Sequence, residues 1–165
     1  NTKDCTKELC DNQLSADYLL RYQINVPDDT TADVCDGCTI SMELIYEYEA
    51  WIGIGFSKDG QMVGSEAVIG LPGENKVQKY NLVGKNAGSV SSSVTLMPES
   101  QQTLSDVSIE FKDGQTVMKF TKIMKEEGEI EISPGDNTFI WAHGSSNELG
   151  YHSARKAIQL DLSAA

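Results

Sequence analysis

The side chains best suited to chemistry in this chain are a sulfur and an imidazole that lie far apart in the sequence. Met62 sits in a stretch with Gly60 and Gly64, where an apolar side chain outside a core gains nothing from packing. The chain has two histidines, His143 and His152, both in the late segment WAHGSSNELGYHSARK. A thioether and an imidazole are the usual axial pair of six-coordinate haem iron. Spacing alone leaves the alternatives open, a core methionine and a surface histidine.

Motifs for other chemistry are absent from the sequence. There is no G-x-S-x-G elbow for a nucleophilic serine, and the glycines between positions 53 and 64 match no phosphate-binding loop. Cys35-Asp-Gly-Cys38 is followed by Thr39, where covalent haem attachment requires histidine. The acidic stretch around Asp28 and Asp33 lacks the ligand order of a calcium loop. These gaps leave few cofactor alternatives.

The four cysteines, Cys5, Cys10, Cys35 and Cys38, all lie in the first quarter of the chain. An even number of cysteines around an irregular segment predicts disulfides, and hence an extracellular or luminal location. The sequence leaves all three pairings open. A zinc site is the alternative, but no basic or nucleic-acid context supports it.

Composition predicts one globular domain over residues 1–165. The content of 39% hydrophobic and 23% charged residues is ordinary for such a domain, and no apolar run reaches the roughly 20 residues of a membrane span. With 25 acidic against 13 basic residues, the net charge of −12 repels phosphate backbones, which argues against a nucleic-acid partner. The chain begins at Asn1, as expected for a mature form whose targeting peptide has been removed.

The elements that must position Met62 and the histidines are short strands. Apolar residues alternate from Ile40 to Tyr48, and Asp113-Gly114 suits the tight turn of a hairpin. Residues 1–15 have no period and are expected to form a loop tied down by disulfide. We predict strands at 18–26, 40–48, 51–56, 66–71, 76–83, 94–97, 106–112, 116–123, 138–142 and 156–162. Ten short strands separated by turns favour an antiparallel β-sandwich.

Three further segments carry expectations. Trp51, Gly53 and Gly55 share one face of their strand, and the glycines there allow another backbone or a flat ligand to approach closely. Residues 84–93, GKNAGSVSSS, have the composition of a flexible connector. The acidic segment 126–131 is expected to be a solvated, exposed edge.

With these residues in hand, the sequence resembles the DOMON superfamily, specifically the haem-binding cytochrome branch found in cellobiose dehydrogenase and in ferric-reductase-like transmembrane cytochromes. The segment WIGIGFSKDGQMVGSEAVIG follows the family pattern W-x-G-x-G-(F/L)-S and then M-x-G-(S/A)-(E/D)-x-V-I-G. The tail FIWAHGSSNELGYHSARKAIQLDL is a looser match. The resemblance covers roughly residues 18–162.

The resemblance implies an all-β, immunoglobulin-like antiparallel β-sandwich with one non-covalent haem b in a pocket at one end. Carried over by residue, the axial ligands fall on Met62 and His152. Arg155 is a candidate partner for a haem propionate, because a guanidinium pairs bidentately with a carboxylate. Further candidates for the pocket are Tyr151, Trp51 and His143. A bis-histidine site using His143 stays open.

The resemblance also implies a function. It predicts a domain that is secreted or held at the extracellular face of a membrane and relays single electrons, without a substrate-turnover site of its own. Its redox partner would be a flavin dehydrogenase, a copper enzyme or a transmembrane cytochrome, and the acidic surface would favour a basic docking patch. The alternative is a haem-free sandwich that binds carbohydrate or a small aromatic compound through Trp51, Trp141, Tyr46 and Tyr151.

Overall fold

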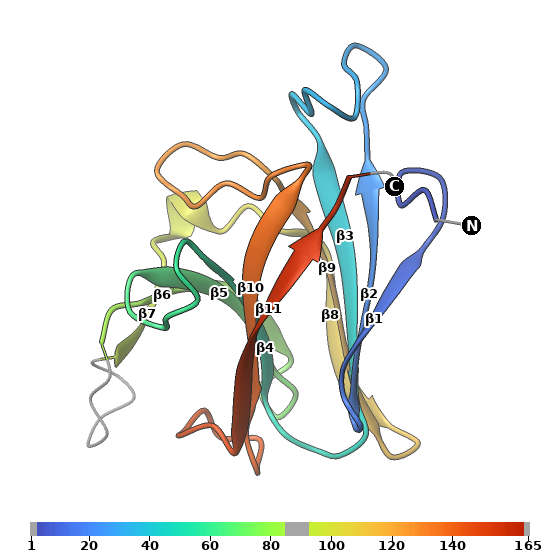
Figure 1. Ribbon diagram of the computed structural model, residues 1–165. Helices are drawn as coiled ribbons and strands as arrows, with labels where there is room; N and C mark the ends of the chain where they lie inside the picture. Colours follow the sequence, from blue (N-terminus) through green and yellow to red (C-terminus); the bar gives the residue numbers. More distant parts are fainter. Residues whose placement is uncertain (1–2, 85–92, 164–165) are drawn as a thin grey trace.

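Two antiparallel β-sheets face each other as a sandwich in the computed structural model, which describes residues 3–84 and 93–163 (Figure 1). One sheet has five strands in the order β1-β2-β3-β9-β8, and the other has six in the order β11-β10-β4-β5-β6-β7. This arrangement confirms the predicted all-β sandwich. Most of the expected connector 84–93 lies outside the described residues.

The strand bounds follow the predicted alternation closely. The five-stranded sheet contains β1 (Cys10–Ser15), β2 (Tyr18–Asn25), β3 (Thr39–Tyr46), β9 (Gln115–Ile123) and β8 (Ser105–Lys112). The six-stranded sheet contains β11 (Ala154–Asp161), β10 (Asp136–His143), β4 (Ile52–Ser57), β5 (Ser65–Leu71), β6 (Lys76–Leu82) and β7 (Val94–Leu96). A short 3₁₀ turn, η1 (Glu99–Gln101), follows β7. No helix in the described part of the chain is long and apolar enough to cross a membrane.

The main core lies between the sheets, and a second apolar cluster covers the outer face of the six-stranded sheet. Ile54 and Phe56 of β4 point into the main core. The residues with the opposite parity, together with neighbours on β5 and β6, form the outer cluster: Trp51, Ala67, Ile69, Leu71, Tyr80 and Leu82. Side chains alternate between the two faces of a strand, and an apolar cluster covers each face of this sheet. Strands β4 and β5 are therefore buried on both faces.

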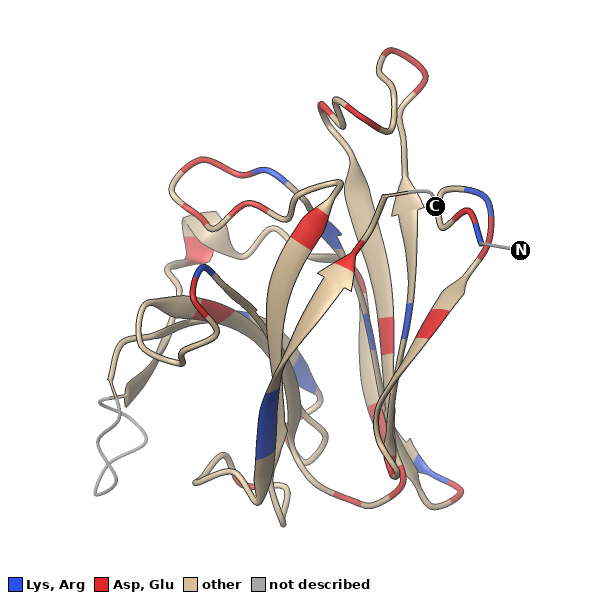
Figure 2. Ribbon diagram, in the orientation of Figure 1, with Lys and Arg blue, Asp and Glu red and all other residues tan. Residues whose placement is uncertain are grey.

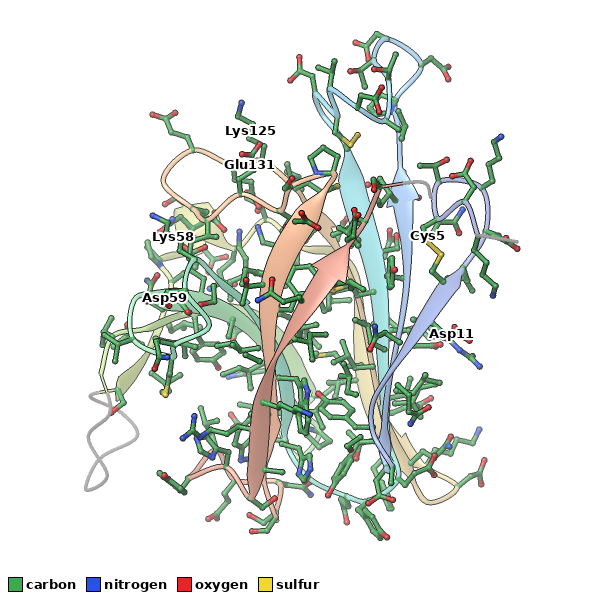
Figure 3. The ribbon with its side chains drawn as sticks, in the orientation of Figure 1. Cys5, Asp11, Lys58, Asp59, Lys125 and Glu131 are labelled. Atoms are coloured by element: carbon green, nitrogen blue, oxygen red, sulfur yellow. A yellow bond between two sulfur atoms is a disulfide. The ribbon has the colours of Figure 1, made fainter. Side chains whose placement is uncertain are left out.

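The N-terminal segment differs from the expected loop. Its second half forms β1, an edge strand that pairs antiparallel with β2 and brings Cys10 opposite Tyr22. Cys10 and Leu14 are the two buried residues of the sequence CDNQLS, so the pairing of this edge strand with β2 rests largely on backbone hydrogen bonds. The disulfides are Cys5–Cys10, visible beside β1 in Figure 3, and Cys35–Cys38.

The prediction that segment 126–131 is solvated is wrong for two of its glutamates. Lys125 and Glu131 of the β9–β10 connection are exposed (Figure 3). The side chain of Glu129, however, is only 2% exposed, and it lies with Glu126 against Lys79 and Lys122, whose side chains are each 1% exposed. The lysines come from other strands, so periodicity within the segment could not reveal their charge.

Candidate functional site

A large pocket lies over the outer face of the six-stranded sheet, whereas the resemblance implied one end of the sandwich. The cavity of this outer-face pocket is about 200 Å³, and it opens to solvent at its mouth. Strands β4, β5, β10 and β11 and the loops 58–64 and 144–153 line it. The lining includes five residues singled out from the sequence: Trp51, Met62, Tyr151, His152 and Arg155. Only the fold brings them together.

The floor of the outer-face pocket depends on glycine. A Cβ atom at Gly55 would lie 2.5 Å from Cγ1 of Ile140 and 3.0 Å from the carbonyl oxygen of Glu66. A Cβ atom at Gly53 would lie 3.3 Å from Cγ1 of Ile69. The two glycines therefore let isoleucines of the neighbouring strands close over β4. The sequence had suggested that the glycines leave space for a ligand, but at Gly55 the space is filled by Ile140.

The Met62 loop is held by two serines at the strand ends. Ser57, the last residue of β4, accepts a hydrogen bond from the Gly60 amide at 2.9 Å, and its hydroxyl lies 3.2 Å from the carbonyl oxygen of Gln61. Ser65, the first residue of β5, donates to the same carbonyl oxygen at 2.5 Å. These bonds fix the backbone immediately before Met62, which is half-buried. The sequence reasoning gave neither serine a role, although both belong to the quoted family pattern.

Gly60 explains how this loop folds over the sheet. Its φ angle is +81°, in the left-handed region that favours glycine. A Cβ atom there would lie 3.7 Å from Cβ of Ala157 on β11 and from Cγ2 of Thr138 on β10. The loop after β4 therefore turns back across β10 and β11, and Met62 is carried to the outer-face pocket.

The His152 loop reaches the pocket from the opposite end of the same strands. Strand β10 runs antiparallel to β4, so its last residue, His143, pairs with Ile52 at the start of β4. The Gly144 amide donates to the Trp51 carbonyl oxygen at 3.0 Å, which ties the β10–β11 loop to the chain entering β4. The thioether and the imidazole thus enter the outer-face pocket from loops at opposite ends of the β4–β10 pair.

The electrostatics of the pocket differ from those of the whole molecule. The described lining residues include Arg155 and Lys156, on the basic stretch of β11 in Figure 2, but no carboxylate. Burial, with a smaller contribution from the positive charge of Arg155, lowers the pKa of His152 below its ordinary value. A neutral imidazole has a free nitrogen lone pair for a metal. In a chain of net charge −12, this pocket suits an apolar ligand with anionic groups.

His143 does not line the outer-face pocket. It lies on the interior face of β10, where its ring stacks on Tyr46 with a centroid distance of 4.1 Å. Its Nδ1 atom lies 3.0 Å from the hydroxyl of Ser153. The structure therefore separates the two histidines, and only His152 shares a pocket with Met62.

The ligands that this pocket offers to a metal are the thioether sulfur of Met62 and an imidazole nitrogen of His152. Within residues 3–84 and 93–163, no group of three or more His, Cys, Asp or Glu side chains is arranged to hold a metal ion. Met62 and His152 are a donor pair that suits an iron already held by a macrocycle, because they need to supply only two ligands.

Fold and site together define a β-sandwich domain with an apolar ligand pocket on one sheet. A family model described as the DOMON domain matches residues 33–144, and the chain belongs to this family. Two solved structures share the fold with a TM-score of 0.58 each. The cytochrome b domain of pyranose dehydrogenase from Coprinopsis cinerea is 12% identical, with 88% of this chain and 76% of that chain covered. The cytochrome domain of cellobiose dehydrogenase from Myriococcum thermophilum is 14% identical, with 94% and 82% covered.

Two similar proteins of Arabidopsis thaliana are each described as a cytochrome b561 and DOMON domain-containing protein. One is 44% identical over 97 residues, which cover 49% of this chain and 24% of the relative. The other is 51% identical over 45 residues, which cover 25% of this chain and 12% of the relative. The chain therefore matches less than a third of the length of either relative.

Proposed function

We propose that residues 1–165 form a single secreted b-type cytochrome domain that relays single electrons, with Met62 and His152 as axial ligands of one non-covalent haem. The observation that carries the proposal is that these two side chains line one apolar pocket, on loops at opposite ends of the same strands. The similarity to cytochrome domains supports it at the level of the fold. The disulfides Cys5–Cys10 and Cys35–Cys38 support an oxidising compartment.

The residues of the outer-face pocket fit such a group. Ile69 and Ile140 would supply apolar contacts to the macrocycle, and the glycines of β4 let these two side chains lie close against the sheet. Arg155 lines the pocket and would pair with a propionate, since a guanidinium binds a carboxylate bidentately. Haem iron would supply a one-electron couple, and the protein would set its potential through the ligands, burial and hydrogen bonds. Methionine ligation favours a higher potential than a bis-histidine site.

The domain would exchange electrons with another protein and turn over no substrate by itself. The solved neighbours are parts of pyranose and cellobiose dehydrogenases, and the curated relatives carry a cytochrome b561 part. By analogy, the partner is a flavin dehydrogenase, a copper enzyme or a transmembrane cytochrome. Tyr151, which is 71% exposed, lies at the mouth of the pocket, where such a partner would approach.

Visible spectroscopy tests the cofactor. Protein purified after expression with added haem should show a Soret band, and sharp α and β bands should appear on reduction. Acid–acetone extraction should release the haem, because it is held without a covalent bond. A protein that takes up no haem under these conditions would refute the proposal.

Substitution of the two ligands tests the site. Met62→Ala and His152→Ala should each convert the six-coordinate spectrum to one that binds carbon monoxide readily, because each opens one axial position. Met97→Ala is the matched control, since Met97 is buried but does not line the outer-face pocket. If either ligand variant keeps the wild-type spectrum and excludes carbon monoxide, another residue holds the iron.

The carbohydrate alternative finds weaker support. Of the four aromatic residues expected to stack on sugars, Trp51, Trp141 and Tyr46 are buried, which leaves Tyr151 as an exposed ring. Calorimetry of the haem-free protein against soluble glycans tests this reading, and measurable heat of binding would favour it.

A further inference from the structure

His143, the histidine that does not line the outer-face pocket, makes contacts that the proposed electron-transfer site does not explain. His143 is 8% exposed, and its ring is held by the stack on Tyr46 and by an edge contact with Tyr18 at 5.8 Å. Its Nδ1 atom lies 3.0 Å from the hydroxyl oxygen of Ser153 and 3.1 Å from the carbonyl oxygen of Gly144. A buried imidazole aimed at a loop in this way can order that loop.

The partners of Nδ1 identify its proton. The carbonyl oxygen of Gly144 can only accept, so we assign the hydrogen of the ring to Nδ1, which then donates to this oxygen. The Ser153 hydroxyl lies 3.0 Å from the same carbonyl oxygen and 3.3 Å from that of His143, so it donates to a carbonyl oxygen and can accept from Nδ1. The Ser153 amide also donates to the carbonyl oxygen of His143 at 2.9 Å.

These bonds hold the residue that directly follows His152. Ser153 links the His152 loop to β11, whose second residue, Arg155, lines the outer-face pocket. The neighbouring residue Tyr151 is largely exposed, so little packing fixes the chain on the other side of His152. Together with the β10–β11 pairing that begins at Ala154, the hydrogen bonds to Ser153 therefore constrain the backbone that carries this imidazole.

We propose that His143 is a positioning residue. Through Ser153, its ring holds the backbone of His152 so that the His152 imidazole faces the outer-face pocket. This inference rests on the proposed haem site for its functional consequence, but the ordering of the loop is a property of the chain itself. An outer residue that orients a ligand typically changes metal affinity or activity about 10- to 100-fold when it is removed.

Three variants separate the role of the N–H group from that of the ring. His143→Phe keeps a planar ring against Tyr46 and loses the donor, whereas His143→Asn restores an N–H donor close to the Nδ1 position. Ser153→Ala removes the hydroxyl from the loop. Ser133→Ala is the matched control, because Ser133 bonds the Gly135 amide in the β9–β10 connection, away from the pocket lining.

In the haem-loaded protein, His143→Phe and Ser153→Ala should bind haem about tenfold more weakly. Both variants should also shift the midpoint potential and admit carbon monoxide to the reduced iron. His143→Asn should recover most of the wild-type behaviour, and Ser133→Ala should not differ from wild type. A lower melting temperature with unchanged potential and carbon monoxide exclusion would show that His143 is merely structural, and would overturn the inference.

Hydrogen exchange on the haem-free protein separates this inference from the proposed function. The Ser153 amide should exchange at least about tenfold faster in His143→Phe and Ser153→Ala than in wild type, because an opening energy lower by 1.4 kcal/mol gives a tenfold change. Unchanged exchange would overturn the inference whether or not haem binds. If His143→Phe fails to fold, Ser153→Ala decides the result, since its side chain is on an exposed loop. If wild type takes up no haem, the proposed function fails while exchange still tests the loop.

Discussion

Glu66 is a single residue whose environment gives the fold a dependence on pH. It belongs to β5 and is largely buried, and its Oε1 atom accepts the Ile130 amide at 2.7 Å. Burial raises the pKa of its carboxyl group, and the nearby Glu129 adds to the increase, while the Ile130 amide and two lysines oppose it. The folded protein therefore holds this proton to a higher pH than the unfolded chain does.

Replacing Glu66 by Gln should stabilise the protein at neutral pH. Between the ordinary glutamate pKa and the raised value, the folded state binds more protons than the unfolded state, so wild-type stability falls as the pH rises through that window. Glutamine keeps an oxygen that accepts the Ile130 amide and carries no charge. Urea unfolding should show a gain at pH 7 that disappears near pH 4. Glu110→Gln on the exposed strand β8 is the control, and an equal gain at both pH values would contradict the argument.

At the scale of the element, glycines on two neighbouring strands of the six-stranded sheet leave room for close packing, one on each face of that sheet. Gly55 of β4 faces the outer-face pocket, and Gly70 of β5 faces the sandwich interior, where a Cβ atom would lie 2.7 Å from Cδ1 of Ile109 and from Sδ of Met118. Both positions admit no side chain without movement of a neighbour. They therefore form a matched pair for separating fold from site.

Gly55→Ala and Gly70→Ala should each lower the free energy of unfolding by about 1–3 kcal/mol, because each added methyl group overpacks its face. Only Gly55→Ala should also weaken haem binding, since it displaces Ile140, which lines the pocket. Urea unfolding and haem titration of both variants measure the two effects. Equal loss of haem affinity in the two variants would show that the effect on the pocket is indirect.

At the scale of the whole molecule, buried ion pairs connect the two sheets. Lys79 comes from β6 of one sheet and Lys122 from β9 of the other. The Nζ atom of Lys79 lies 2.9 Å from Glu129 and 3.2 Å from Glu126, and that of Lys122 lies 3.3 Å and 3.0 Å from the same two residues. The β9–β10 connection is thereby fastened to both layers.

Lys79→Met should lower the free energy of unfolding by about 3–5 kcal/mol, because it removes one of the two lysines from the cluster and leaves the buried carboxylates of Glu126 and Glu129 to share the single charge of Lys122. The control is Lys76→Met on the same strand, whose pair with Glu74 is exposed and should contribute less than about 1 kcal/mol. Urea denaturation of both variants compares them directly. Similar losses in the two variants would mean that the buried cluster does not hold the sheets together.

Much of the fold and of the candidate site could be predicted from local patterns. Alternation over 40–48 predicted β3, and Asp113-Gly114 predicted the hairpin turn, where both residues have a positive φ angle. The loop methionine and the late histidine were identified from residue type and family pattern, and they line one pocket. These features could be predicted because strand periodicity, turn chemistry and sequence motifs are properties of short stretches of chain.

Only the tertiary structure decided which distant residues meet. It put the pocket on the outer face of a sheet, turned His143 inward toward Ser153, and buried Glu129 against Lys79 and Lys122. It also made β1 a strand, although its sequence has no apolar period, because β2 supplies the backbone partners. The sequence by itself determined the strands other than β1, the hairpin turn at Asp113-Gly114 and the ligand candidates. The environments of Glu129 and His143 depend on residues from other elements of the fold, and no local sequence pattern shows which of these residues will be in contact.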